Sequence, residues 1–445
     1  MVTSPDPDPN DPSPSVPAPA ARGPAEPAAE ILAVLVIGAG QAGLSAAGQL
    51  LRKRLRPNED FVILDANDGP GGAWRHRWDA LTFDAAHGIH DLPGMPLDPP
   101  DPAEPASRVV ARYYGSYERE LGLPIVRPVR VESVEHHTAP TENDGKAGHF
   151  TVTGADGRTW RARTVINATG TWDSPYIPYY PGIAEFNGRQ LHTRGYSSAA
   201  DFAGQRVLVV GGGTSALQFL LQLDQAGART VWTTRRAPDW ADRFFDASWG
   251  VDVEASVSAR TTMGLPPLSV VAATGLPVTE QYLAGLTSGV LISRGPLRRI
   301  TPTGAVLDGP GPDGGAVPSQ GHVADALLAP GGAAAGGLDR VPALTGRACT
   351  AVSTEDPLTT WETEVDTILW ATGFRASMDH LSPLHVRERG GGVMMLPDGV
   401  SVVKRPGLFL VGYGASASTI GATRAGRRAA VQAAAASHPP QSGHL

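Results

Sequence analysis

The run Ile31-Leu-Ala-Val-Leu-Val-Ile37, followed at once by Gly38-Ala-Gly40-Gln-Ala-Gly43, is the most informative stretch of this 445-residue chain. The apolar run is typical of a buried parallel strand. The first glycine permits a tight turn, the second lets the backbone approach a pyrophosphate, and the third lets helix and strand pack closely. A phosphate then lies at the positive end of the next helix. The stretch predicts a dinucleotide-binding strand, turn and helix.

The next strand of this unit, Phe61-Val-Ile-Leu64, ends in Asp65. A carboxylate at this point accepts hydrogen bonds from the hydroxyls of an adenosine ribose. An ordinary Gly-rich turn is the alternative, but it explains neither the preceding strand nor the acid. The first unit therefore suits FAD.

A second unit follows the same plan. The strand Arg206-Val-Leu-Val-Val210 leads into Gly211-Gly-Gly213-Thr-Ser-Ala216, and the next strand, Thr230-Val-Trp-Thr-Thr234, ends in Arg235-Arg236. A guanidinium pairs with a 2'-phosphate, which a carboxylate there would repel. The second unit therefore suits NADPH, with two solvated surface arginines as the open alternative.

Composition limits the partners. The formal net charge of -7 argues against nucleic acid or an anionic membrane surface. No stretch of about twenty apolar residues is present to span a bilayer, and the N-terminus lacks the order of a secretory signal. We expect a cytoplasmic protein whose partners are a small-molecule substrate and O2, with a homodimer as an open alternative.

Cysteine and histidine usage excludes several kinds of site. Cys349 is the only cysteine, so the chain has no internal disulfide and no redox-active cysteine pair. His87 and His90 lack a third ligand at metal spacing, and we expect no metal.

The chain is expected to be an α/β protein with two Rossmann-like dinucleotide-binding domains, the second inserted in the first. Two matched runs, Thr164-Val-Ile-Asn-Ala-Thr-Gly170 and Thr367-Ile-Leu-Trp-Ala-Thr-Gly373, resemble crossing points between them. A final strand, Leu408-Phe-Leu-Val411, leads through Gly412 into an alanine-rich helix at about 418–437. The expected divisions are a disordered Pro/Ala-rich arm at 1–29, FAD-binding parts at 31–185 and 346–436, and an NADPH-binding domain at 186–345. The Gly- and Pro-rich stretch from Thr301 to about Gly337 predicts loop, with an insertion at 309–337.

With these motifs in view, the chain resembles the flavin-containing monooxygenases, or class B flavoprotein monooxygenases. The segments that support this are Val36-Ile-Gly-Ala-Gly-Gln-Ala-Gly-Leu44, Gly71-Gly-Ala-Trp74 and Phe186-Asn-Gly188-Arg-Gln-Leu-His192-Thr-Arg-Gly-Tyr196. The last matches the family identifier Phe-x-Gly-x-x-x-His-x-x-x-aromatic. Its end in Tyr196 instead of tryptophan resembles heteroatom-oxidising members more than Baeyer-Villiger enzymes.

The resemblance implies roles for named residues. Gly71, Gly72 and Trp74 would contact the flavin, and the helix that begins at Ser418-Thr419 would face its pyrimidine ring. Asp84 and Arg235 are the candidate catalytic residues, which would tune a proton beside the flavin; Asp84 as an ordinary turn residue stays open. The whole set of cofactor contacts predicted by motif and resemblance is Gly38, Gly40, Gln41, Ala42, Gly43, Asp65, Gly71, Gly72, Trp74, Val131, Thr169, Gly170, His192, Gly211, Gly213, Thr214, Ser215, Arg235, Arg236, Thr372, Gly373, Gly412, Ser418 and Thr419.

The implied reaction is a monooxygenation. NADPH would reduce FAD, and reduced flavin would activate O2 as a C4a-(hydro)peroxyflavin that oxygenates a nitrogen, sulfur or carbonyl group. Baeyer-Villiger oxygenation of a ketone and a reductase that passes electrons to a partner are the alternatives. Trp240, Phe244, Phe245 and Trp249 would line a substrate pocket or pack a core, and the core is favoured.

Overall fold

The fold was analysed in a computed structural model, which describes residues 30–86, 89–138, 148–240, 257–267, 275–276, 279–309, 360–417 and 419–437. Contacts divide the chain into a unit of residues 1–30 and a unit of residues 31–445, and the second unit is described below. Several predictions fall outside the described residues: the arm at 1–29, most of the insertion at 309–337, and those on His87, Phe244, Phe245, Trp249, Cys349 and Ser418. Among the described residues, no helix combines the length and apolar character that a membrane span requires.

The first sheet contains the strands predicted for the first unit. Its strand order is β3-β2-β1-β6-β5-β4, with β14 paired to β6. Pairing is parallel among β3, β2, β1, β6 and β14, whereas β4, β5 and β6 form an antiparallel meander. The strands are β1 (Leu32–Ile37), β2 (Phe61–Leu64), β3 (Ile125–Val126), β4 (Val131–His137), β5 (His149–Gly154), β6 (Thr159–Asn167) and β14 (Leu408–Leu410).

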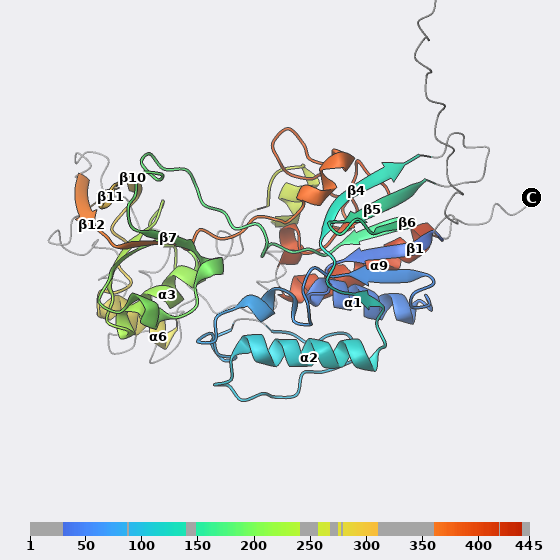
Figure 1. Cartoon of the computed structure of the whole chain (residues 1–445), viewed down its shortest axis with the longest axis horizontal. Helices are drawn as coiled ribbons and strands as arrows, with labels where there is room; N and C mark the ends of the chain where they lie inside the picture. Colours follow the sequence, from blue (N-terminus) through green and yellow to red (C-terminus); the bar gives the residue numbers. More distant parts are fainter. Residues whose placement is uncertain are drawn as a thin grey trace, which may run out of the picture. The chain divides into compact units, whose positions relative to one another are not determined.

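Helices α1 (Gln41–Arg52) and α9 (Thr419–Ser437) pack together against this sheet, as Figure 1 shows. Small residues at the contact allow the two helices to approach each other closely. A Cβ on Gly426 of α9 would lie 2.3 Å from the carbonyl oxygen of Ala42 in α1, so the two backbones nearly touch. The alanines of α9 that are buried here are Ala422, Ala425, Ala429, Ala430 and Ala433. Apolar residues of α2 (Ala106–Glu120) complete this core.

The second sheet is fully parallel, with the order β7-β13-β8-β9. Its strands are β7 (Arg189–His192), β8 (Arg206–Val210), β9 (Arg229–Thr233) and β13 (Thr367–Trp370), and α3 (Thr214–Gln225) crosses from β8 to β9. We expected residues 346–436 to return to the first sheet. Instead β13 pairs with β7 and β8, so the chain leaves the second sheet only after Trp370.

A small antiparallel sheet corrects a second expectation. β10 (Leu297–Thr301), β11 (Gly304–Asp308) and β12 (Thr360–Glu364) form a three-stranded sheet. The stretch from Thr301 was predicted as loop because glycine and proline are frequent in it. Residues 304–307 are nevertheless buried, and their pairing on both sides outweighs the weak local signal.

The remaining helices are short. One of them is the α-helix α6 (Glu280–Thr287), whose apolar residues pack beside those of α3 in one core, and residues 257–262 are also α-helical. The 3-10 helices are η1 (Gly72–His76), η3 (Thr193–Gly195), η4 (Ala199–Phe202), η7 (Asp379–Leu384) and η8 (Gly414–Ala417).

Candidate functional site

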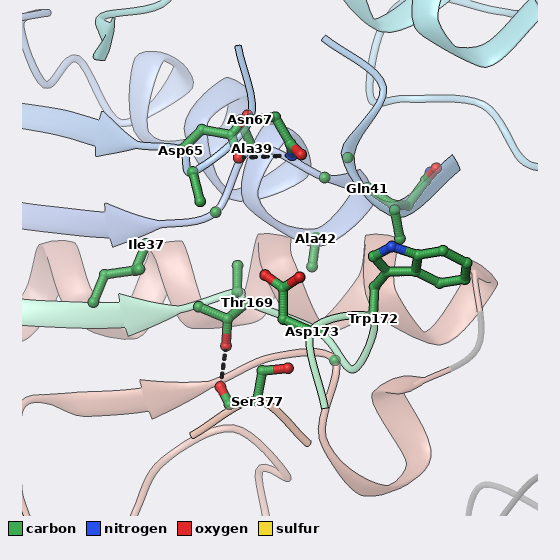
Figure 2. A pocket seen from close by; sticks show the side chains of 18 of the residues that line it. Ile37, Ala39, Gln41, Ala42, Asp65, Asn67, Thr169, Trp172, Asp173 and Ser377 are labelled. Carbon is green, nitrogen blue, oxygen red and sulfur yellow. Dashed lines mark hydrogen bonds between the residues drawn. The ribbon is translucent and has the colours of Figure 1, made fainter. Parts of the chain in front are cut away.

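A cavity of about 320 Å³ lies where parallel strands of the first sheet end. Its wall includes the glycine turn after β1, the end of β2, η1, the run that follows β6, and the segment before α9. Figure 2 shows labelled side chains from the glycine turn, from the end of β2 and from the run after β6 around one space. Ligands of open α/β sheets bind at this edge.

Sterically forced glycines build the turn in the cavity wall. Gly38 has φ +102°, and a Cβ on it would lie 2.5 Å from the carbonyl oxygen of Ala168. A Cβ on Gly43 would lie 1.9 Å from the carbonyl oxygen of Gly38. Both positions therefore need glycine for the protein's own packing. Gly40 differs, because its Cβ would meet only the Cα of Gly72, at 3.9 Å. The space at Gly40 is free for a ligand.

Asp65 at the end of β2 belongs to a buried charge cluster. Its carboxylate accepts hydrogen bonds from Arg127 Nε at 2.7 Å and from Asn67 Nδ2 at 3.1 Å. The Arg127 guanidinium also donates to both carboxylate oxygens of Glu118, at 2.6 and 2.7 Å. The side chains of Asp65, Arg127 and Glu118 are only 5%, 13% and 12% exposed. Arg127 therefore holds Asp65 in place, with lone pairs left to accept a further hydrogen bond.

A chain of hydrogen bonds crosses the other wall. Asn167 Oδ1 and His380 Nε2 are 2.7 Å apart, and Asn167 Nδ2 donates to Thr169 Oγ1 at 3.1 Å. Thr169 in turn donates to the carbonyl of Ser377 at 2.6 Å (Figure 2). Burial lowers the pKa of His380 to about 4, so its ring is neutral near pH 7. The motif search missed His380, because an isolated histidine has no spacing signal.

His192 of the family identifier is a positioning residue. Its Nε2 donates to the carbonyl of Gly373 at 2.9 Å, and its Nδ1 accepts from the backbone N–H of Arg194 at 3.2 Å. This pair of bonds requires the neutral ring, and burial lowers the pKa of His192 accordingly. The ring meets Phe374 edge-on, and Phe374 stacks on Trp172, which lines the cavity. His192 itself is not among the lining residues.

The predicted contacts of the first unit converge on the cavity. Those that line it are Gly38, Gly40, Gln41, Ala42, Asp65, Gly71, Gly72, Trp74, Val131, Thr169, Gly170 and Gly412. Gly43 packs behind the turn, and Thr372 donates to the carbonyl of Tyr176 without lining the cavity. Thr419 begins α9, and Ser416 and Ala417 just before it line the cavity.

Asp84 does not lie in the cavity wall. The residue is exposed, and its Oδ1 accepts from the backbone N–H of Ala85 at 2.8 Å and from the hydroxyl of Thr82. These bonds are those of a turn residue. The burial on which its expected proton chemistry depends is not found, so the catalytic role of Asp84 stays a prediction without support.

The second glycine turn lies after β8. Gly211 has φ +141°, and its Cβ would lie 2.1 Å from the carbonyl oxygen of Ala371, whereas a Cβ on Gly213 would meet nothing within 4 Å. The first turn shows the same contrast, because the protein's own packing requires glycine at Gly38 but leaves space beside Gly40. Thr214 and Ser215 open α3 directly behind it.

Arg235 and Arg236 follow β9 and are both exposed, and no ion pair to either is found among the described residues. Ser293 forms a parallel β-bridge with Trp232 of β9, and the backbone N–H of Arg294 donates to the carbonyl of Trp232 at 2.8 Å. The backbone of Arg294 therefore lies beside the strand that precedes the two arginines. Sequence reasoning missed Arg294 because no motif connects it to β9.

Two units that each join parallel strands through an open glycine turn are typical of pyridine-nucleotide-dependent oxidoreductases. A family model described as pyridine nucleotide-disulphide oxidoreductase matches residues 35–260, just over half of the chain. The solved structure of a flavin-containing monooxygenase from Stenotrophomonas maltophilia is 31% identical, with a TM-score of 0.64, over 90% of this chain and 97% of that one. The chain therefore belongs to the pyridine nucleotide-disulphide oxidoreductase family, in its flavin monooxygenase group.

Curated relatives match a shorter part of the chain. Senecionine N-oxygenase of Tyria jacobaeae is 24% identical over 58% of this chain and 60% of its own length. Indole-3-pyruvate monooxygenase of Oryza sativa subsp. japonica is 29% identical over 45% of this chain and 47% of its own. The matches span about half the length of such relatives. Bacillithiol disulfide reductase of Bacillus cereus, at 16% identity and a TM-score of 0.56, shares the fold alone.

Proposed function

We propose that this oxidoreductase binds FAD on its first unit and NADPH on its second, and that it inserts one oxygen atom of O2 into a nitrogen, sulfur or carbonyl group of a small molecule. The observation that most supports this is the cavity, whose wall combines the open Gly40 turn with the fixed carboxylate of Asp65. Bound flavin supplies the chemistry that accepts electrons from a nicotinamide and activates O2.

The residues present fit a flavin dinucleotide. The turn offers backbone N–H groups at the N-terminus of α1, which has neither an acid in its first turn nor a side-chain cap to compete with a phosphate. Asp65 remains able to accept a ribose hydroxyl. Trp74 and Trp172 add aromatic surface to the wall.

The arginines after β9 favour NADPH over NADH. Arg235 and Arg236 are exposed cations at the end of the strand where the ribose of a nucleotide on the second turn would lie. A charge-assisted contact with the 2'-phosphate contributes about 1.5 to 3 kcal/mol, or about 10- to 150-fold in affinity. Salt would reduce this preference, because exposed charges are screened.

Isotope labelling tests the monooxygenase proposal. Purified protein with FAD and NADPH is given labelled O2 and a panel of amines, thioethers and ketones, and products are followed by mass. We expect one labelled oxygen atom in a product, with NADPH oxidised in equal amount. Stoichiometric hydrogen peroxide with every substrate class would refute oxygenation and favour an oxidase or a reductase.

Paired substitutions test the cofactor choice. Replacing Arg235 and Arg236 with alanine should weaken NADPH binding by about 10- to 150-fold and leave NADH binding unchanged. Arg229→Ala, which removes an exposed arginine from the first residue of β9, is the matched control and should change neither. Equal loss of both nucleotides in the double variant would show that these arginines are structural.

A further inference from the structure

The cavity wall contains one charged side chain whose counterion is missing from the described part of the chain. Arg77 follows η1 and lines the cavity. Its guanidinium carbon lies 4.5 Å from the ring centre of Trp172 and 5.9 Å from that of Trp74. No acid or carbonyl among the described residues accepts a hydrogen bond from it. Burial is the sole cause that lowers the pKa of Arg77, to about 10, so it remains charged near pH 7.

The other charges that line the cavity are already paired. Asp65 is held by Arg127, as described above. Arg130 contacts Asp173 at 3.2 Å, and Asp173 also contacts Arg194 at 3.0 Å. Pairing within the protein thus leaves a single cation, Arg77, facing the cavity among the described charged residues. A half-buried cation that lacks an anion is unfavourable, and contact with aromatic faces offsets only part of this.

The position of Arg77 indicates which anion it meets. It ends the short helix η1, whose first residue, Gly72, abuts the glycine turn: a Cβ on Gly72 would lie 2.8 Å from the Cα of Gly40. The same cavity is therefore lined by Arg77 and by the turn that faces a pyrophosphate. Backbone N–H groups and a helix terminus supply only partial charges, whereas a diphosphate carries two full negative charges.

We propose that Arg77 is the cationic side chain that binds the diphosphate of the flavin dinucleotide. This inference rests on the proposed binding of FAD by the first unit. The guanidinium donates to phosphate oxygens while its face remains on Trp172. Arg77 is thus left without a counterion by the protein itself, and the cofactor brings that counterion when it binds.

Binding to the FAD-free protein tests the proposal without any turnover. FAD and ADP are titrated by calorimetry into wild type, Arg77→Gln and Arg77→Lys. We expect Arg77→Gln to bind both ligands about 10- to 100-fold more weakly, with a smaller dependence on salt, and Arg77→Lys to recover part of the loss. Arg108→Gln, which removes an exposed arginine paired with Asp79, is the control for net charge and should bind as wild type does.

Stability of the FAD-free protein distinguishes a ligand-binding role from a packing role. If Arg77 awaits an anion, Arg77→Gln should unfold at the same or a higher urea concentration than wild type, because a half-buried unpaired charge is removed. Lower stability with unchanged FAD and ADP affinity would overturn the proposal. Unchanged affinity for FAD and ADP with a lower flavin midpoint potential would also overturn it, and would assign Arg77 to the anionic reduced ring. Failure of wild type to bind FAD would instead refute the proposed function.

Discussion

Gly40→Ala separates binding of a dinucleotide from folding of the unit that binds it. A Cβ at this position would have only the Cα of Gly72 within 4 Å, and φ of -88° suits any residue. The substitution therefore fits the protein's own packing. We expect the free energy of unfolding of the FAD-free protein to change by no more than about 0.5 kcal/mol.

The expected loss of affinity follows from the same geometry. A methyl group in this open space would keep the diphosphate away from the N–H groups of the turn. Losing two charge-assisted hydrogen bonds of about 1.5 kcal/mol each would weaken binding by about 3 kcal/mol, or roughly 150-fold in Kd.

Gly43→Ala is the contrasting variant. Its Cβ would lie 1.9 Å from the carbonyl oxygen of Gly38, a backbone atom that has no rotamer to move. Alanine inside a helix normally gains about 1 kcal/mol over glycine, but overpacking typically loses about 1 to 3 kcal/mol, and this contact is severe. We therefore expect net destabilisation from Gly43→Ala, where helix propensity alone would stabilise.

Flavin titration and urea unfolding of the FAD-free proteins give the two readouts. Quenching of FAD fluorescence reports Kd, and circular dichroism reports the free energy of unfolding. Wild-type FAD affinity in Gly40→Ala would refute the reasoning, because the diphosphate would then not touch the turn. Equal destabilisation by both substitutions would show that the difference in space around the two glycines has no energetic meaning.

Two further predictions concern the charged and titrating groups of the wall. Arg127→Met should lower the free energy of unfolding by about 3 to 5 kcal/mol, because Asp65 and Glu118 would be left buried without their cation. Arg130→Met, at an ion pair whose arginine is 59% exposed, should lower it by at most about 1 kcal/mol. Urea unfolding at pH 7 measures both, and similar losses in the two variants would contradict the prediction. The pKa of His380 is about 4 in the folded protein, against an ordinary 6.5. As pH falls, the unfolded chain therefore binds a proton at this histidine before the folded protein does. The contribution of His380 to stability is complete above pH 6.5 and is lost by pH 4. The loss is about 3 kcal/mol, and it should be absent from His380→Gln; identical pH profiles of the unfolding free energy would show that His380 titrates normally.

The sequence predicted those parts of the fold whose signal is local. An apolar run, a glycine turn and a charged residue at the end of the next strand placed β1, β2, β8 and β9 correctly, because each pattern follows from contacts within about thirty residues. β11 was missed, since its strand character comes from pairing with β10 and with β12, which lies more than fifty residues later.

The candidate site shows the same limit. Gly40 and Asp65 were predicted because the motif defines their roles, and both line the cavity. Asp84 was placed by the family resemblance, and a resemblance in sequence cannot show that its carboxylate bonds within its own turn. The role proposed for Arg77 was not predicted. It depends on Arg77 having no acidic neighbour among the described residues, and the sequence does not show which residues will be neighbours in space.

The place of β14 and α9 in the first sheet has a consequence for how the protein is made. On the ribosome, β1 and α1 emerge first, yet the strand beside β6 and the helix beside α1 come from the last forty residues described. The second sheet lacks only β13 once β9 has emerged, and it is complete at Trp370. The first sheet is therefore begun first and completed last. Until β14 is made, the edge of β6 with which it pairs stays uncovered, and such an unpaired edge favours aggregation and chaperone binding. A nascent chain arrested before residue 408 should be unable to retain flavin.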